Sequence, residues 1–391
     1  MKPIPLLLAL SLATLSIETP IFSRAMEIPM DPTQKNKPVT IKVLLQEKEP
    51  SLLLEVKGPY KIFCPHTDIL LSSSSSAKRA FITPSSNGLS WGETLPGNQA
   101  LRIVPSDNKT SIFVNGIQYK GCLEVYDLGG SLRAIIESDV ENYLKSCLAT
   151  SFFDVEEPEV LNALTIVLRT QTYHQIQKDP LAAWHTTAVD SGYRGFAITF
   201  QNVAIEKAIN STRHAVLTYN AKPFATGWTE NSAGVTASFS SVFKKNSPSP
   251  KGVKIAGMEA ERLKSAWSFQ VAKDQLATIA KLAQVSSASA FSEKGSGKVY
   301  AVKINDGSNI KTLDFFALQE ALGKNKLKSN DFTIEVLDNA IRFKGYGEGN
   351  GVGLCLHSAT LMAKQGLDAK TILSKFFEEA SLEKMEKLPS N

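Results

Sequence analysis

Cysteine is scarce in this chain, with four residues among 391, and no two of them are spaced as Cys-x-x-Cys. That absence argues against a zinc ribbon. If the chain is exported, Cys64, Cys122, Cys147 and Cys355 can form up to two disulfides; four buried thiols are the alternative. A P-loop and a dinucleotide fingerprint are also missing, because the glycine-rich stretch at residues 344–353 has neither spacing. We therefore expect no metal and no cofactor.

Runs of basic residues are missing as well. The net charge is +5 with scattered Lys and Arg, so we expect no nucleic-acid partner. The longest apolar run, residues 5–17, is too short to span a membrane. It follows Lys2 and precedes the small residues Ser23 and Ala25, which is typical of a secretory signal. We predict a signal peptide over residues 1–25 and export to the periplasm or cell envelope. An uncleaved membrane anchor is the alternative.

The first hundred residues after this signal alternate between apolar and polar side chains, with no helical period. Residues 39–45 (VTIKVLL) are rich in β-branched residues and predict a strand. Asn115-Gly116 predicts a tight hairpin turn between strands at 111–114 and 117–126. The serine run at 72–76 is expected to be a loop. Further strands are predicted at residues 51–56, 60–64 and 133–137.

The stretch around which the chain is organised runs from residue 139 to residue 177. Residues 139–147 predict a short helix, and 148–154 a connector. Residues 156–177 predict one long helix with a single apolar face. Asp154, with Glu157 three residues later, is expected to cap it as a capping box.

The remaining segments mix helices and strands. Residues 228–236 (WTENSAGVT) form a polar loop suited to hold a ligand. In residues 344–353 glycine recurs at every second position, so one face of the chain lacks side chains and another backbone or a sugar can approach. A packing turn is the alternative. Strands are predicted at 267–271, 299–304 and 332–337, helices at 204–210, 273–283 and 354–365 and after Asp368, a strand–turn–strand at 212–224, a linker at 244–254, a serine-rich loop at 285–298, and a frayed tail from 382.

The order of these motifs resembles the SpoIID/LytB family, which comprises stage II sporulation protein D and the LytB amidase enhancers. Glu-x-Tyr-Leu at 141–144 is followed by a connector, a Pro-x-x-Leu-x-Ala helix, and Arg169-Thr170. Further similar segments follow in the family's order, at residues 114–121, 212–219, 232–236 and 347–366. The resemblance covers roughly residues 40–380. It implies work on peptidoglycan: members resemble lytic transglycosylases that cut between N-acetylmuramic acid and N-acetylglucosamine, or proteins that stimulate amidases.

The chain departs from the family pattern at the residues that carry the chemistry. A lytic transglycosylase can use one carboxyl group as acid and then base. The family's connector glutamate corresponds to Ser151 here, and an aliphatic hydroxyl cannot replace that acid. The family's glycine-motif His and Trp correspond to Asn350 and Glu348, and its long-helix Gln to Leu164. Its zinc-binding His and Cys, expected just after His185-Thr186-Thr187, are Ala188 and Val189.

Two glutamates could supply a relocated catalytic acid. Glu348 lies in the glycine-rich stretch, and Glu156 lies just past Ser151. The alternative is that both are solvated charges, since Glu156 in a first helical turn is favoured by the helix dipole. The residues predicted to bind substrate are Ser151, Arg169, Thr170, Trp228, Ser232, Asn350 and His357. Structural roles remain open for Arg169, for Trp228 as a core aromatic, and for His357 as a packed histidine.

We therefore predict an α+β protein in which a β-rich N-terminal part packs with a mixed α/β SpoIID-like core. The predicted domains are a signal peptide at 1–25, a flexible leader at 26–38, the β-rich part at 39–138, the core with a glycan groove at 139–381, and a tail at 382–391. We predict that the protein is exported and acts on peptidoglycan, binding glycan strands and cleaving them. A binder without activity, or an enhancer of a cell-wall amidase, is the alternative because of Ser151.

Overall fold

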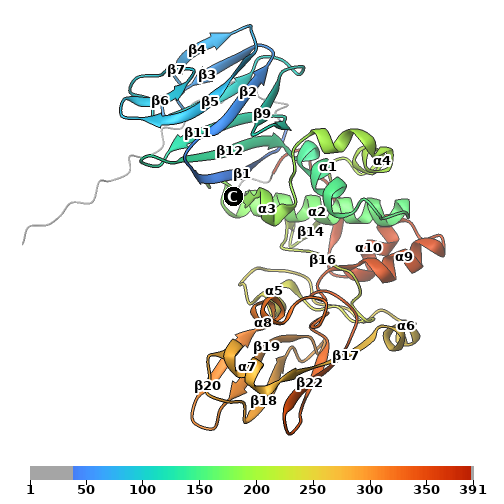
Figure 1. Cartoon of the computed structure of the whole chain (residues 1–391). Coiled ribbons are helices and arrows are strands. Elements are labelled where there is room, and N and C mark those ends of the chain that lie inside the picture. The colour runs from blue at the N-terminus through green and yellow to red at the C-terminus, as the bar shows by residue number, and fades with distance from the viewer. Residues whose placement is uncertain (1–37, 389–391) are drawn as a thin grey trace, which may run out of the picture. The chain divides into compact units, whose positions relative to one another are not determined.

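The computed structural model describes residues 38–388, and the predicted signal peptide, most of the leader and the last three residues lie outside them. The fold is α+β, as predicted, with several sheets and helices (Figure 1). In the described part, no helix combines the length and the apolar character needed to cross a bilayer.

Two sheets build the β-rich part. The seven-stranded sheet has the order β13-β1-β12-β11-β8-β3-β4 and the six-stranded sheet the order β10-β9-β2-β5-β6-β7. Alternating residues from both sheets enter one hydrophobic core; they include Ile41 and Leu54, which are at most 1% exposed. The strands are β1 (Thr40–Glu49), β2 (Leu52–Lys57), β3 (Tyr60–Phe63), β4 (Leu70–Ser74), β5 (Lys78–Ser85), β6 (Gly88–Trp91), β7 (Glu93–Thr94), β8 (Ala100–Pro105), β9 (Ser111–Val114), β10 (Ile117–Tyr119), β11 (Cys122–Asp127), β12 (Leu132–Asp139) and β13 (Thr186–Thr187).

The hairpin at Asn115-Gly116 is confirmed, with positive φ at both turn residues and β9 paired to β10. The strand predicted at 117–126 is wrong in one respect, because it divides into β10 and β11, which belong to different sheets. Gly121 separates them: its φ is +123°, and a Cβ there would collide with the carbonyl oxygen of Glu137.

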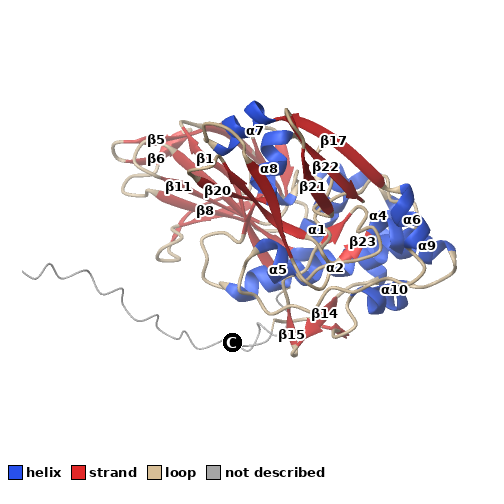
Figure 2. Cartoon of the chain, turned by 90° about the horizontal axis from the view of Figure 1, so that it is seen from below, coloured by secondary structure: helices blue, strands red, loops and turns tan. Residues whose placement is uncertain are grey.

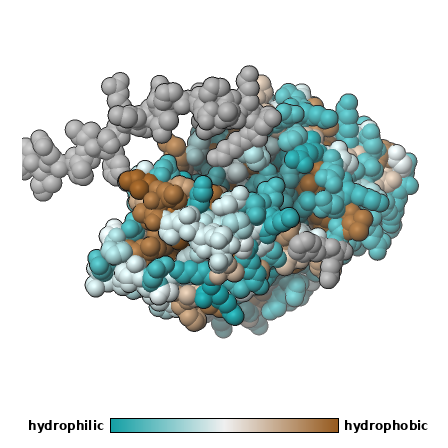
Figure 3. Space-filling view, turned by 90° about the horizontal axis from the view of Figure 1, so that it is seen from above, coloured by the Kyte–Doolittle hydropathy of each residue, from teal (hydrophilic) through white to brown (hydrophobic). Residues whose placement is uncertain are grey.

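Figure 3 shows the surface of the molecule from above. Most of the surface in that view is polar, and hydrophobic residues gather in patches.

The helical layer follows the β-rich part and carries the organising stretch. Helix α1 (Val140–Ser151) begins at Asp139, whose carboxylate accepts hydrogen bonds from the amides of Glu141 and Asn142. Helix α2 (Pro158–Lys178) contacts α1, α9 (Leu356–Lys364) and α10 (Ala369–Phe376). The predicted capping box is wrong, since α2 begins at Pro158 after Glu157 and has no side-chain cap. The connector is therefore residues 152–157.

Short elements complete this layer. A small sheet in the order β15-β14-β24 lies beside α2. The tail predicted to be frayed from residue 382 instead forms β24, which pairs with β14. The elements are α3 (Ala188–Ser191), the 3-10 helix η2 (Ala197–Gln201), α4 (Val203–Ser211), β14 (Ala215–Tyr219), β15 (Lys222–Pro223), β16 (Trp228–Thr229), α5 (Phe239–Phe243), α6 (Glu259–Lys264), β23 (Leu354–Cys355) and β24 (Ser381–Lys384).

Residues 266–346 have a hydrophobic cluster of their own, which we call the inserted unit. The chain on either side of it belongs to the main core, which resumes at Leu354. The unit holds two three-stranded sheets, β17-β22-β21 and β18-β19-β20, and two helices (Figure 2). The bounds are β17 (Ala266–Ala272), α7 (Lys273–Ala280), β18 (Ser287–Ser292), β19 (Val299–Asn305), β20 (Ile310–Asp314), α8 (Phe315–Leu322), β21 (Phe332–Val336) and β22 (Ala340–Tyr346).

Candidate functional site

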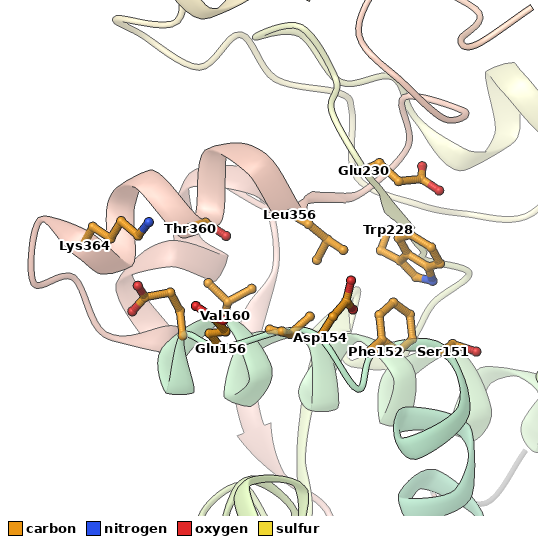
Figure 4. Close-up of a pocket in the computed structure, with 12 residues that line it drawn as sticks. Ser151, Phe152, Asp154, Glu156, Val160, Trp228, Glu230, Leu356, Thr360 and Lys364 are labelled. Carbon is orange, nitrogen blue, oxygen red and sulfur yellow. The ribbon is translucent and has the colours of Figure 1, made fainter. Parts of the chain in front are cut away.

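A cavity of about 360 Å³ lies where the connector, the start of α2, β16 and α9 meet. Its volume falls within the usual range of small-molecule sites. Figure 4 shows Trp228 and Glu230 at one end and Thr360 and Lys364 at the other. The lining residues are Ser151, Phe152, Asp154, Val155, Glu156, Glu157, Val160, Trp228, Glu230, Leu356, Thr360 and Lys364. We call it the connector pocket.

The glycine-rich stretch supports the pocket indirectly, because it packs against the chain segment that carries Trp228 and Glu230. Strand β16 runs parallel to β23, and bridges join Asn231 to Glu348 and Ala237 to Val352. Gly349 has φ +94°, and a Cβ there would collide with the Glu230 carboxylate and the Thr229 hydroxyl. The close approach predicted for these glycines therefore occurs, and the segment that approaches is residues 227–233.

Aromatic side chains form the end of the pocket nearest Glu230. Trp228 is half-buried and meets Phe152 edge-on, with ring centroids 4.7 Å apart and an interplanar angle of 80°. Phe152 is buried, so its ring holds the indole of Trp228 in place. An indole held in this way can stack on an apolar sugar face while its polar edge stays wet.

Glu230 is the residue that the sequence reasoning missed. Its side chain is exposed by relative surface area, but partial burial of the carboxyl raises its pKa, and the nearby charge of Glu348 raises it further, against an opposing effect from Lys324. A carboxyl that keeps its proton to higher pH is suited to act as a general acid. The signal in the sequence was present but unused, since Glu230 lies within the polar loop predicted to hold a ligand.

Three predicted site residues, Ser151, Glu156 and Trp228, line this one pocket. Ser151 lies at its edge, where a Cβ on Gly192 would come within 2.9 Å of its hydroxyl oxygen. Asp154, predicted to cap α2, instead points into the pocket (Figure 4). Glu156 is exposed.

The structure contradicts a substrate-binding role for Arg169 and Thr170, because both are 0% exposed. The Arg169 guanidinium makes two hydrogen bonds to Glu141, at 2.9 and 2.7 Å, and donates to the carbonyl oxygens of Thr212 and Ala215. The Thr170 hydroxyl donates to Ile166 O and accepts from Leu217 N. These residues join α2 to α1 and β14, which is the structural alternative that the sequence left open.

The other predicted residues lie near the pocket but do not line it. Ser232 is 0% exposed, and its amide donates to the sulfur of Cys355 at 3.2 Å. Asn350 accepts from the amide of Val352 within its own turn. His357 contacts Glu261 at 3.0 Å.

Glu348 is exposed and acts on the pocket through its charge on Glu230 rather than as a wall. Cys64, Cys147 and Cys355 carry free thiols, and burial raises the pKa of Cys147 to about 12. Over residues 38–388, no group of His, Cys, Asp and Glu side chains could hold a metal ion.

Comparison with known proteins finds similarity between this chain and one protein family. The model of the family described as stage II sporulation protein, SpoIID, matches residues 129–219, which hold α1, the connector and α2. Stage II sporulation protein D of Bacillus subtilis is 27% identical over 175 residues, which are 44% of this chain and 49% of that protein. The family model and the two Bacillus relatives support a SpoIID-family protein.

Other relatives are also similar to this chain. An uncharacterised protein of Chlamydia pneumoniae is 36% identical over 179 residues, 45% of this chain and 65% of that protein. One of Brachyspira hyodysenteriae is 27% identical over 344 residues, 86% of this chain and 91% of that protein. The chain covers 65% and 62% of the two chlamydial relatives, less than two thirds of each. Membership in the SpoIID family supports a function related to the cell wall.

Proposed function

We propose that this protein is exported, binds peptidoglycan glycan strands in the connector pocket, and cleaves them between N-acetylmuramic acid and N-acetylglucosamine. Three features support a sugar in this pocket: its volume of about 360 Å³, the aromatic wall of Trp228 and Phe152, and several carboxylates that can accept hydrogen bonds from hydroxyl groups. Family membership supports the cell-wall setting.

The observation that carries the proposal of cleavage is the raised pKa of Glu230 inside the pocket. In our mechanism, protonated Glu230 donates its proton to the glycosidic oxygen as the bond from that oxygen to C1 of muramic acid breaks. The resulting carboxylate then takes the proton of the C6 hydroxyl as O6 bonds to C1. The products are a 1,6-anhydromuramic end and a free hydroxyl on the next sugar, and no water is consumed. One carboxyl group returns to its starting state, so no nucleophilic carboxylate is needed.

Glu230 thus takes the role for which Glu348 and Glu156 were considered. Glu156 stays a second candidate because it lines the same pocket. Glu348 is assigned a supporting role, since its charge helps Glu230 to retain a proton.

One observation favours a second function, glycan binding without cleavage. The position of the family's connector acid carries the hydroxyl of Ser151, at the edge of the pocket. In this alternative the protein holds strands for a partner such as a cell-wall amidase.

The test is digestion of glycan strands stripped of their peptides, followed by mass spectrometry for anhydromuramic ends. We expect products with the wild type and with Glu320→Gln, an exposed residue of α8 outside the pocket that controls for loss of one charge. We expect Glu230→Gln to lower the rate by about 100-fold or more, as loss of a general acid does. Co-sedimentation without products supports the binder, and equal rates for all variants exclude Glu230 as the acid.

Export is tested separately by fractionation of cells that carry a C-terminally tagged chain. We expect the tag in the cell envelope, with deletion of residues 2–25 leaving it in the cytoplasm. A cytoplasmic full-length chain would contradict this part of the proposal.

A further inference from the structure

The turn between α8 and β21, residues 323–328 (GKNKLK), carries three lysines at every second position. Lys324, Lys326 and Lys328 are exposed, and none of them forms an ion pair with another residue in the range 38–388. We call this segment the lysine turn.

The lysine turn is held rigidly although its lysines are exposed. Leu327 is 0% exposed and packs in the core of the inserted unit. Its amide donates to Gly323 O at 3.1 Å, and its carbonyl accepts from the side-chain amide of Gln319 at 2.8 Å. The charges are therefore presented from an ordered loop, which loses less conformational entropy on binding than a flexible one.

This turn is joined to the glycine-rich stretch that packs against the segment carrying Glu230. The carbonyl of Lys328 accepts from the amide of Gly349 at 2.9 Å, and Ser329 bridges to Gly349. Gly349 in turn is the residue whose missing side chain makes room for the Glu230 carboxylate. Lys324 is close enough for its charge to favour the ionised form of Glu230. The inserted unit thus places the charge of Lys324 near Glu230, and it holds the backbone of Lys328 against Gly349.

The pocket itself has an excess of negative charge. Asp154, Glu156, Glu157 and Glu230 line it, against one ammonium group, that of Lys364. A polymer that carries carboxylates would be repelled from such a cavity unless nearby cations offset the field. Lys364 lies at the far end from Glu230 (Figure 4), so the Glu230 end depends on the lysine turn.

We infer that the lysine turn is an anion subsite that binds carboxylates of the glycan strand next to the bond held at Glu230. The inference deepens the proposed function and rests on it. Two parts of peptidoglycan carry this chemistry: the lactyl carboxylate of muramic acid, free once the peptide is removed, and the carboxylates of the stem peptide. Exposed ion pairs are individually weak, so the three lysines act together.

The experiment compares the full chain with two triple variants of equal charge change. One is Lys324→Gln/Lys326→Gln/Lys328→Gln. The control is Lys281→Gln/Lys294→Gln/Lys311→Gln, three exposed lysines in the same unit: the C-cap of α7, the turn between β18 and β19, and β20. Each is titrated, at low and at high salt, with end-labelled strands of three kinds: peptide-free, peptide-free with carboxylates converted to methylamides, and peptide-bearing. Fluorescence anisotropy gives the dissociation constants.

We expect the lysine-turn variant to bind peptide-free strands about five- to tenfold more weakly than the control at low salt, a loss that high salt removes. It should bind the methylamide strands as well as the control does. If the loss appears only with peptide-bearing strands, the stem peptide supplies the carboxylate instead. Equal binding of both variants to all carboxylated strands overturns the subsite while leaving the proposed function standing. If the wild type binds no strand of any kind, the proposed function and the subsite both fail.

Discussion

Replacement of Arg169 by Met separates a structural role from a substrate-binding role at the centre of the family motif. Arg169 is 0% exposed and Glu141 is 7% exposed, so the two charges interact out of contact with solvent. The guanidinium also donates to Thr212 O at 2.9 Å and to Ala215 O at 3.1 Å. Met has a similar length but no donor, so the variant leaves a buried carboxylate and two backbone carbonyls without these hydrogen bonds.

The expected loss follows from what is left behind. Removing one partner of a buried ion pair costs about 3–5 kcal/mol, because the other charge remains desolvated. With an unfolding entropy of about 2.1 cal/mol/K per residue, that corresponds to a fall in melting temperature of roughly 4–7 °C for a chain of this size. The double variant Arg169→Met/Glu141→Met removes both charges and should recover about half of the loss or more. Arg169→Lys keeps the charge but not the two-point contact, so it should fall between the wild type and Arg169→Met.

The assay is thermal unfolding by circular dichroism, with glycan co-sedimentation measured well below the transition. We expect Arg169→Met to be less stable and yet to bind strands normally while folded. A variant that melts like the wild type but no longer binds glycan would refute the structural role and restore Arg169 to the substrate site.

Three further predictions concern the pocket. Gly349→Ala and Gly366→Ala both place a Cβ at positive φ, which costs about 1 kcal/mol. Ala at position 349 also meets the Glu230 carboxylate and the Thr229 hydroxyl, so this variant should be the less stable of the two. Measured below the melting transition of both, cleavage should fall at least tenfold in Gly349→Ala alone, and equal rates would contradict the geometry. The raised pKa of Glu230 means that cleavage should decline as pH rises through that pKa; in Glu348→Gln the like charge is gone, so a pH–rate profile should show the decline at lower pH, and an unmoved decline would count against the coupling. Trp228→Ala should weaken glycan binding about tenfold, as loss of an aromatic anchor does, whereas Trp228→Phe should retain most of it; unchanged binding in the first variant would remove the indole from the site.

Much of the fold could be predicted because local patterns and tertiary packing agree. Strand β1 alternates and its inward residues are buried, and Asp368 caps α10 as expected. The serine-rich segments were predicted to be loops, yet they form β4 and β18. Serine has little strand preference, so these strands form through pairing with a neighbour: Ser73 opposes Lys61, and Ser289 opposes Lys303. The sequence also gave no sign that residues 266–346 have a separate core.

Residues could be proposed for the site from motifs within one segment of the sequence. A residue whose properties depend on a second, distant segment could not. Ser151, Glu156 and Trp228, which were proposed from the family motif, from proximity to it and from the polar loop, line one cavity, and their roles stay predictions. Glu230 stood in that loop as one polar residue among several. Its pKa depends on the pocket walls and on Glu348, which the fold brings close from far along the chain.

The most direct test of the central claim is a crystal structure of Glu230→Gln with a bound peptide-free glycan fragment. The account predicts a sugar ring against Trp228, with a glycosidic oxygen about 3 Å from the side chain at position 230, within hydrogen-bond reach. A fragment bound elsewhere, such as in the larger cavity lined by Lys120, Lys145 and Arg213, would contradict it.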